Sequence, residues 1–220
     1  MSITLKDIKK NPAVKAYITK SDESLLAIGY TEHSFAHVTK VAVTAQAILN
    51  ETGHTKREGE LAAIAGYLHD IGNMINRKGH ETSGALMAFH LLSQMGMPEE
   101  EIATITTAIG NHDESSAFPV NDVAAALIIA DKSDVRRTRV RNKDTIAFDI
   151  HDRVNYAVTS SVITVKPDSK EILLTLEIDV ESSPISEYFE IFLSRMILCR
   201  KAAEKLGYRF SLIINEQKMM

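Results

Sequence analysis

Apolar residues recur at helical spacing through the first two thirds of this chain of 220 residues. Over residues 38–49 and 61–68, valine, isoleucine, leucine and alanine return every three or four positions, which is typical of the buried face of an α-helix. A further apolar helix is expected from residue 121 towards residue 135. The spacing predicts a mostly α fold, in which residues 1–158 form one helical domain.

The last part of the chain, residues 159–220, has a different pattern. Residues 161–166 and 171–178 are short, rich in β-branched side chains and separated by a turn sequence, which predicts a β-hairpin. A long amphipathic helix is expected over residues 185–206, followed by a strand over residues 208–214. We therefore expect a small α+β appendage of hairpin, long helix and strand, packed on the helical domain.

Composition and charge narrow the classes of partner. The formal net charge of −4 at pH 7 provides no general attraction to nucleic acid or to anionic membranes. Cys199 is the only cysteine, so no disulfide can form within the chain, and the first residues lack the pattern of a signal peptide. No apolar stretch approaches the roughly 20 residues that span a bilayer. A cytoplasmic protein without membrane or nucleic acid partners is expected.

A histidine and an aspartate, His69 and Asp70, directly follow the apolar run of residues 61–68. A buried helix end that presents both side chains needs partners for them, because an unpaired buried carboxylate is costly, and a divalent cation would serve. An isolated pair of this kind is more simply a histidine beside a surface aspartate. Asp131 ends a second apolar run and is either a helix end in water or a further ligand.

Three more histidines stand at expected helix ends. His37 begins a helix, His80 opens another and His112 ends a third. His33 lies one turn before His37, so that it could join the same site or neighbour it. The remaining histidines are interpreted as surface or packing residues: His54, His90 and His151.

Taken together, these residues resemble the HD superfamily of metal-dependent phosphohydrolases. The resemblance covers residues 32–134, and the blocks at residues 65–72 and 129–132 agree with the family pattern. It implies an all-helical core in which one divalent ion is held by His37, His69, Asp70 and Asp131. The additional pair, His80 and His112, resembles the two-metal branch, where the aspartate of the motif bridges both ions. The Gly-Tyr-Pro extension of the cyclic-dinucleotide phosphodiesterases is missing.

The resemblance implies an enzyme that hydrolyses a phosphate ester or phosphoanhydride by metal-activated water. Imidazole and carboxylate ligands suit one or two ions of manganese, iron, cobalt, nickel or zinc, and magnesium is also compatible. We expect Asp70, His69 and Lys132 to take part in catalysis. Lys132 and Arg136, which follow the expected ligand Asp131, are candidates to bind the substrate phosphate, although they could equally belong to a solvated basic helix end.

Two other functions share the same ligand series. Some members of the superfamily are di-iron oxygenases, and a non-enzymatic module could sense a nucleotide at the metal site and signal through the appendage. The expected partner in the hydrolase interpretation is a small phosphorylated metabolite or a nucleotide. The helix over residues 185–206 is first a core element and could also form the surface of a homodimer.

Overall fold

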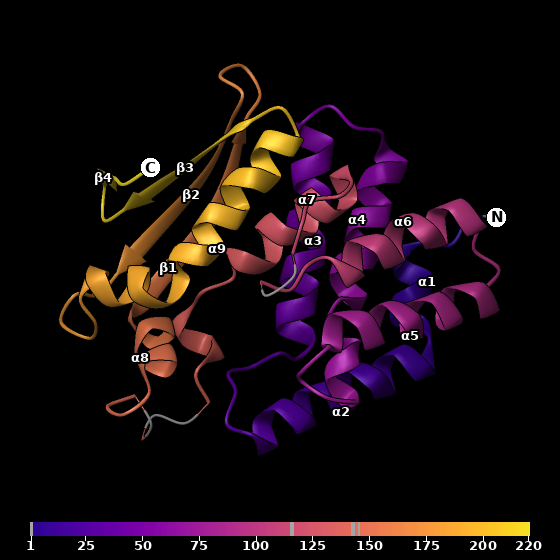
Figure 1. Ribbon diagram of the computed structural model, residues 1–220, viewed down its shortest axis with the longest axis horizontal. Coiled ribbons are helices and arrows are strands. Elements are labelled where there is room, and N and C mark those ends of the chain that lie inside the picture. Colours follow the sequence, from indigo (N-terminus) through magenta and orange to yellow (C-terminus); the bar gives the residue numbers. More distant parts are fainter. Residues whose placement is uncertain (1, 115–116, 142–143, 145) are drawn as a thin grey trace.

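The computed structural model describes residues 2–114, 117–141, 144 and 146–220 and confirms a mostly α chain with a small C-terminal sheet (Figure 1). The helices are α1 (Leu5–Lys10), α2 (Pro12–Ala27), α3 (Phe35–Glu51), α4 (Lys56–Leu68), α5 (His80–Gln94), α6 (Glu99–Gly110), α7 (Asp122–Lys132), α8 (Ile150–Ala157) and α9 (Ile185–Lys205). Two short 3₁₀ helices are η1 (Ile71–Met74) and η2 (Arg137–Arg139).

Helices α4 and α7 occupy the centre of the helical body. Every residue of α4 from Leu61 onwards is buried, as are nine of the 11 residues of α7, which is why neither shows a single apolar stripe along one face. Helix α3 packs closely on α4: a Cβ atom added to Gly66 would lie 2.9 Å from the Cα of Ala42. Small residues at this contact let the two backbones approach, and the close contact fixes α3 against α4.

Side-chain caps fix the starts of three of the helices that carry or directly precede expected metal ligands. Ser34 accepts a hydrogen bond from the first turn of α3, and Asn121 does so for α7. At the start of α4, Thr55 and Glu58 form a reciprocal capping box. The beginnings of these helices are thus encoded locally, before any tertiary contact forms.

The C-terminal sheet has the strand order β1-β2-β3-β4. Its strands are β1 (Val158–Lys166), β2 (Glu171–Ile178), β3 (Arg209–Ile214) and β4 (Gln217–Lys218). The expected hairpin is present as the antiparallel pair β1 and β2, although β1 begins three residues earlier than predicted. Strands β2 and β3 are parallel and are connected by α9, whereas β4 was not predicted and turns back antiparallel to β3.

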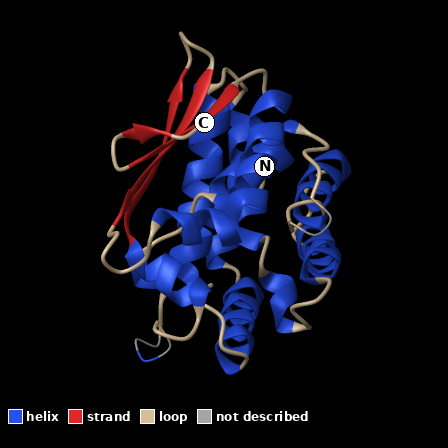
Figure 2. Cartoon of the chain, turned by 60° about the vertical axis from the view of Figure 1, so that its left-hand side comes forward, coloured by secondary structure: helices blue, strands red, loops and turns tan. Residues whose placement is uncertain are grey.

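Helix α9 lies between the helical body and the sheet (Figures 1 and 2). It contacts α7 on one side and β3 on the other, and it buries Tyr188, Phe192, Met196 and Cys199. One hydrophobic core therefore continues from the helices into the sheet. The expected division after residue 158 falls at the junction of α8 and β1, and the two-domain description stays a prediction.

The all-helical core that the resemblance implies corresponds to the helical body. The four strands of the described sheet make the chain mostly α rather than all-α. Within the described ranges, none of the helices combines the length and the apolar content needed to cross a bilayer.

Candidate metal centre

The six expected metal ligands come from five separate elements and meet at one place. His37 lies in the first turn of α3, His69 and Asp70 directly follow α4, and His80 is the first residue of α5. His112 follows α6, and Asp131 lies in the last turn of α7. The four histidines and Asp70 are buried, and Asp131 is partly buried. The ends of the helices, rather than their middles, build the site.

Three of the histidines are held in the same way. The Nδ1 atoms of His69, His80 and His112 lie 2.8, 3.0 and 2.6 Å from the backbone carbonyl oxygen three residues earlier. A carbonyl can only accept, so Nδ1 carries the proton and donates it. Each ring then presents the lone pair of Nε2 to the interior of the site, which is the form of imidazole that binds a metal ion.

His37 is oriented by a carboxylate instead. Its Nδ1 lies 2.8 Å from Oδ2 of Asp134, a side chain that is 1% exposed. Asp134 Oδ1 also lies 3.0 Å from Lys40 Nζ and 3.0 Å from Arg136 Nε. Burial raises the pKa of Asp134, but the hydrogen bond from His37 and the nearby cations outweigh burial, so its pKa is lowered. Asp134 was not predicted from the sequence, although it lies one turn after the expected ligand Asp131.

Four donor atoms lie within reach of a single ion. Nε2 of His37 and Nε2 of His69 lie 3.6 and 3.2 Å from Oδ2 of Asp70, and 3.4 and 3.6 Å from Oδ1 of Asp131. Ligands of one tetrahedral zinc ion, with bonds of about 2.0–2.1 Å, are separated by roughly 3.3 Å. The observed separations fit this spacing.

Three of these four atoms also lack any hydrogen bond. Nε2 of His37, Nε2 of His69 and Oδ2 of Asp70 are buried without a hydrogen-bond partner in the described chain. Buried polar atoms are nearly always satisfied, because an unpaired one costs about 1–3 kcal/mol. A divalent cation would satisfy all three at once, so the residues present fit a bound metal ion.

Asp70 also faces a second group of donors through its other oxygen. Oδ1 lies 3.7 Å from Nε2 of His80, and Nε2 of His80 lies 3.2 Å from Nε2 of His112. The Nδ2 amide of Asn73 donates to the same Oδ1 at 2.9 Å and so fixes the carboxylate plane. The two oxygens of Asp70 therefore point to two adjacent donor groups, as expected for a bridging carboxylate.

The charges of the cluster divide it into two halves. Burial lowers the pKa of His69, but the carboxylates of Asp70 and Asp131 outweigh burial and raise this pKa to about 10. Burial, together with the charges of His69 and Lys132, lowers the pKa of His112 to about 3. Burial also lowers the pKa of His80. The second pair of histidines is thus neutral at physiological pH, and His69 carries a proton unless an ion displaces it.

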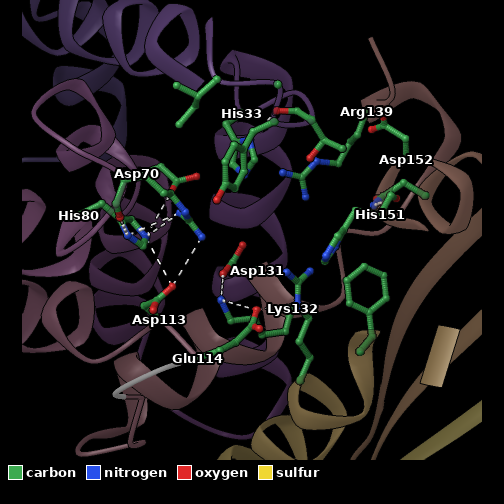
Figure 3. Close-up of a pocket in the computed structure, with 18 of the residues that line it drawn as sticks. His33, Asp70, His80, Asp113, Glu114, Asp131, Lys132, Arg139, His151 and Asp152 are labelled. Atoms are coloured by element: carbon green, nitrogen blue, oxygen red, sulfur yellow. Dashed lines mark hydrogen bonds and ion pairs between the residues drawn. The ribbon is translucent and has the colours of Figure 1, made fainter. Parts of the chain in front are cut away.

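A cavity of about 450 Å³ opens over the donor atoms (Figure 3). Asp70 and Asp131 lie at its wall, and four cationic side chains line the same cavity: Arg77, Lys132, Arg139 and Arg195. Nζ of Lys132 lies 2.6 Å from Oδ2 of Asp131 and 3.6 Å from Oε1 of Glu114. The structure thus places Lys132 beside the donor cluster.

Arg136 lies elsewhere. Its guanidinium group pairs with Asp134 at 3.0 Å and with Glu32 at 3.2 Å, and its side chain is not among those that line the cavity. The expectation that Arg136 binds phosphate has no counterpart in this arrangement. Arg136 instead helps to hold the carboxylate that orients His37.

His33, for which the sequence left open a place in the site or beside it, lines the cavity. Its ring centroid lies 5.4 Å from that of His37, and burial lowers its pKa well below the ordinary value. Other cavity residues were not predicted from the sequence. His151, Asp152 and Asn155 of α8 also line it, although His151 was interpreted as a surface residue. The repeated His-Asp dipeptide was the only sequence signal for them. By contrast, His54 pairs with Asp122 at 3.3 Å and His90 is exposed, both outside the cavity.

A family model described as HD domain matches residues 34–152, just over half of the chain. The chain belongs to the HD domain family. All six expected ligands fall within the matched segment of the HD domain, whereas α9 and the sheet lie outside it. HD domains bind divalent metals, and the family includes metal-dependent phosphohydrolases. Comparisons with curated proteins and with solved structures give no match.

Proposed function

We propose that this HD domain is a metal-dependent phosphohydrolase that cleaves a phosphate ester or phosphoanhydride of a nucleotide or other small phosphorylated metabolite. One observation carries the proposal: four of the six expected ligands, Asp70, His80, His112 and Asp131, line the same cavity as four cationic side chains. The cavity volume of about 450 Å³ suits a small molecule. Donors for a divalent ion beside groups that pair with phosphate oxygens favour phosphoryl chemistry.

The six expected ligands would form two adjacent metal sites. His37, His69, Asp70 and Asp131 would hold one ion, and Asp70 with His80 and His112 a second. When bound, such ions lower the pKa of water and neutralise charge on a phosphoryl group. The chain orients these ligands in advance, because the Nδ1 hydrogen bonds fix each imidazole and Asn73 fixes the carboxylate of Asp70. Little reorganisation is then needed when the substrate binds.

Lys132 would hold the substrate phosphate beside the ligands. It is 5% exposed, and its ammonium group remains beside the carboxylates of Asp131 and Glu114. Arg77 lies on the other side of the cluster, with Nη1 3.1 Å from Nε2 and 3.5 Å from Nδ1 of His80. Because the two ring nitrogens are nearly equidistant from it, Arg77 contacts the face of the imidazole and leaves the in-plane lone pair of Nε2 directed into the site. Both cations can then reach phosphate oxygens without displacing a ligand.

A phosphatase and phosphodiesterase screen tests this proposal. We expect the protein, supplied separately with Mn²⁺, Fe²⁺, Co²⁺, Ni²⁺, Zn²⁺ or Mg²⁺, to release phosphate from at least one small phosphomonoester, phosphodiester or phosphoanhydride. Asp70→Ala removes the shared carboxylate and should lower kcat by about 10³-fold or more. Asp168→Ala, in the exposed turn between β1 and β2, is the matched control and should behave as wild type.

Two results would contradict the proposal. Retained phosphate release in Asp70→Ala would remove this carboxylate from the mechanism. Consumption of O₂ by the iron-loaded protein, with no phosphate release from any substrate in the screen, would indicate the di-iron oxygenase chemistry that shares this ligand series.

A further inference from the structure

We propose that the cavity contains a second anion-binding subsite, formed by Arg139 and Arg195, which selects substrates that carry another phosphate or carboxylate group besides the phosphate at the metal centre. The inference rests on the proposed phosphohydrolase function and specifies the class of its substrate. It also gives the C-terminal part of the chain a role, because Arg195 lies on α9, outside the segment that matches the HD domain.

Arg139 is a buried cation that is held mainly by backbone oxygens. It is 5% exposed, with Nε donating to the carbonyl of Glu32 at 2.9 Å and Nη1 to the carbonyl of Asp134 at 2.8 Å. Its other terminal nitrogen, Nη2, has no hydrogen-bond partner among the described residues, and the side chain lines the cavity. The guanidinium is thus fixed in place, and its Nη2 can still donate hydrogen bonds to an anion. Because the group is already ordered, binding an anion costs less entropy.

No carboxylate of the described residues forms a hydrogen bond with Arg139. The one that pairs with it is Asp134, 3.9 Å from Nη1, and this carboxylate also pairs with Lys40 and Arg136. The charges of Asp131, Glu32 and Asp70 act on Arg139 from a longer distance. An incoming anionic group would supply the acceptor that Nη2 lacks.

Arg195 is held in the cavity by an aromatic ring and by an ion pair. Its guanidinium lies over Phe192, 4.3 Å from the ring centroid. Nε lies 2.5 Å from Oε1 of Glu114, but the group is not aligned for a hydrogen bond, and Nε is buried without a hydrogen-bond partner in the described chain. Glu114 also lies 3.6 Å from Lys132, whose nearer partner is Asp131 at 2.6 Å.

Acidic residues line the same wall. Asp149 is one of them, and its Oδ1 accepts from the backbone N–H groups of His151 and Asp152 at 2.7 and 3.3 Å. These hydrogen bonds hold its carboxylate at the start of α8, where the helix dipole favours it. Asp152, also at the cavity, is engaged in interactions of its own. Nη2 of Arg139 and Nε of Arg195 are donors without a hydrogen-bond partner in the described chain, and both belong to side chains that line the cavity.

Three probes with the same three-carbon spacer test the subsite: 3-hydroxypropyl phosphate, 3-(phosphonooxy)propanoate and propane-1,3-diyl bisphosphate. Two of these probes carry a second anionic group. Wild type should show a kcat/KM at least about 10-fold higher for one of these two than for 3-hydroxypropyl phosphate. A higher kcat/KM for 3-(phosphonooxy)propanoate would show that the subsite binds a carboxylate. A higher kcat/KM for propane-1,3-diyl bisphosphate would show that it binds a second phosphate.

The decisive variant is Arg195→Gln, with Arg195→Lys as the conservative change. Arg195→Gln should reduce the preference for the doubly anionic probe by about 10–100-fold, mainly through KM, and Arg195→Lys should retain part of it. Arg200→Gln is the matched control, because Arg200 lies on the same helix, is exposed and forms an ion pair with Glu204 alone among the described residues. The Arg200→Gln protein should prefer the probe with two anionic groups to the same extent as wild type.

Two outcomes overturn the subsite: equal turnover of all three probes by wild type, or an equal loss for all three probes in Arg195→Gln. If no probe is hydrolysed, the proposed function fails for these esters, and titration calorimetry of the Mn²⁺-loaded protein decides the subsite separately. Tighter binding of methylenebisphosphonate than of methylphosphonate, lost in Arg195→Gln, would support it. Equal binding of the two would overturn it.

Discussion

The orientation of His37 depends on one buried carboxylate. Asp134 accepts the Nδ1 hydrogen bond of this imidazole at 2.8 Å and so keeps Nε2 directed to the site. Asp134→Asn replaces the anion by a neutral amide of the same shape. We expect metal affinity to fall by about 10–100-fold, as for other partners that orient metal-binding histidines.

Titration calorimetry with Mn²⁺ measures this loss, and Asp168→Asn in the exposed β1–β2 turn is the matched control. Unchanged affinity in Asp134→Asn would show that backbone packing alone orients His37.

The protonation of His69 makes metal affinity dependent on pH. Without an ion, the pKa of His69 is raised to about 10, so the ring carries a proton at neutral pH that a metal must displace. Asp70 and Asp131 have lowered pKa values and His112 a pKa of about 3, so these ligands release no proton. Affinity should therefore rise about tenfold for each pH unit from about pH 6 to about pH 8.

Calorimetry in buffers of different ionisation enthalpy should show one proton released for each ion bound at this group. Affinity that does not change over the same pH range would contradict a protonated His69.

Some residues of the site could be recognised from the sequence, and others could not. The ligand series was recognisable because each histidine or aspartate stands at a helix end within a known spacing. Asp134 was not recognised, because its role depends on a contact with His37 of α3, about 100 residues away. Arg136 was placed in the phosphate site by proximity in sequence, whereas its side chain turns to Asp134 and Glu32.

At the scale of elements, the contact between η1 and α5 holds Asp70 and His80 together. A Cβ atom on Gly72 would lie 2.0 Å from the carbonyl oxygen of His80 and 2.5 Å from the backbone nitrogen of Gly84. Neither backbone atom can move away cheaply. Gly72→Ala should therefore lower the free energy of unfolding by about 3 kcal/mol and weaken metal binding.

Urea denaturation tests this change. Gly110→Ala is the matched control, since its Cβ would lie 3.8 Å from the Cβ of Ala85 in ordinary contact, and its stability should stay close to that of wild type. A Gly72→Ala protein as stable as wild type would show that η1 can separate from α5.

The long elements were predictable from the sequence, and the short ones were not. The helix over residues 185–206 and the hairpin carry enough periodic residues to be recognised. Helix α8 has only eight residues, about two helical turns, and β4 only two, so both are too short for a periodic pattern to stand out. The position of α8 at the cavity depends on its contacts with η2 and α9, which no local pattern records.

At the scale of the whole molecule, the C-terminal part completes the cavity that the HD domain begins. Helix α9 packs on α7, which carries Asp131, and the same helix brings Phe192 and Arg195 to the cavity wall. The metal ligands and the C-terminal wall are thus linked through one hydrophobic core. Whether two copies of the chain associate through α9 stays a prediction, which light scattering can test.

The central claim is that the buried donor cluster binds a divalent metal ion, and metal analysis tests it most directly. Protein purified without chelators, and protein reconstituted with Mn²⁺, Fe²⁺ or Zn²⁺, should carry at least one equivalent of metal per chain by inductively coupled plasma mass spectrometry. Asp70→Ala should carry far less, and Asp168→Ala the same as wild type. A wild-type chain that binds no metal even after reconstitution would contradict the account.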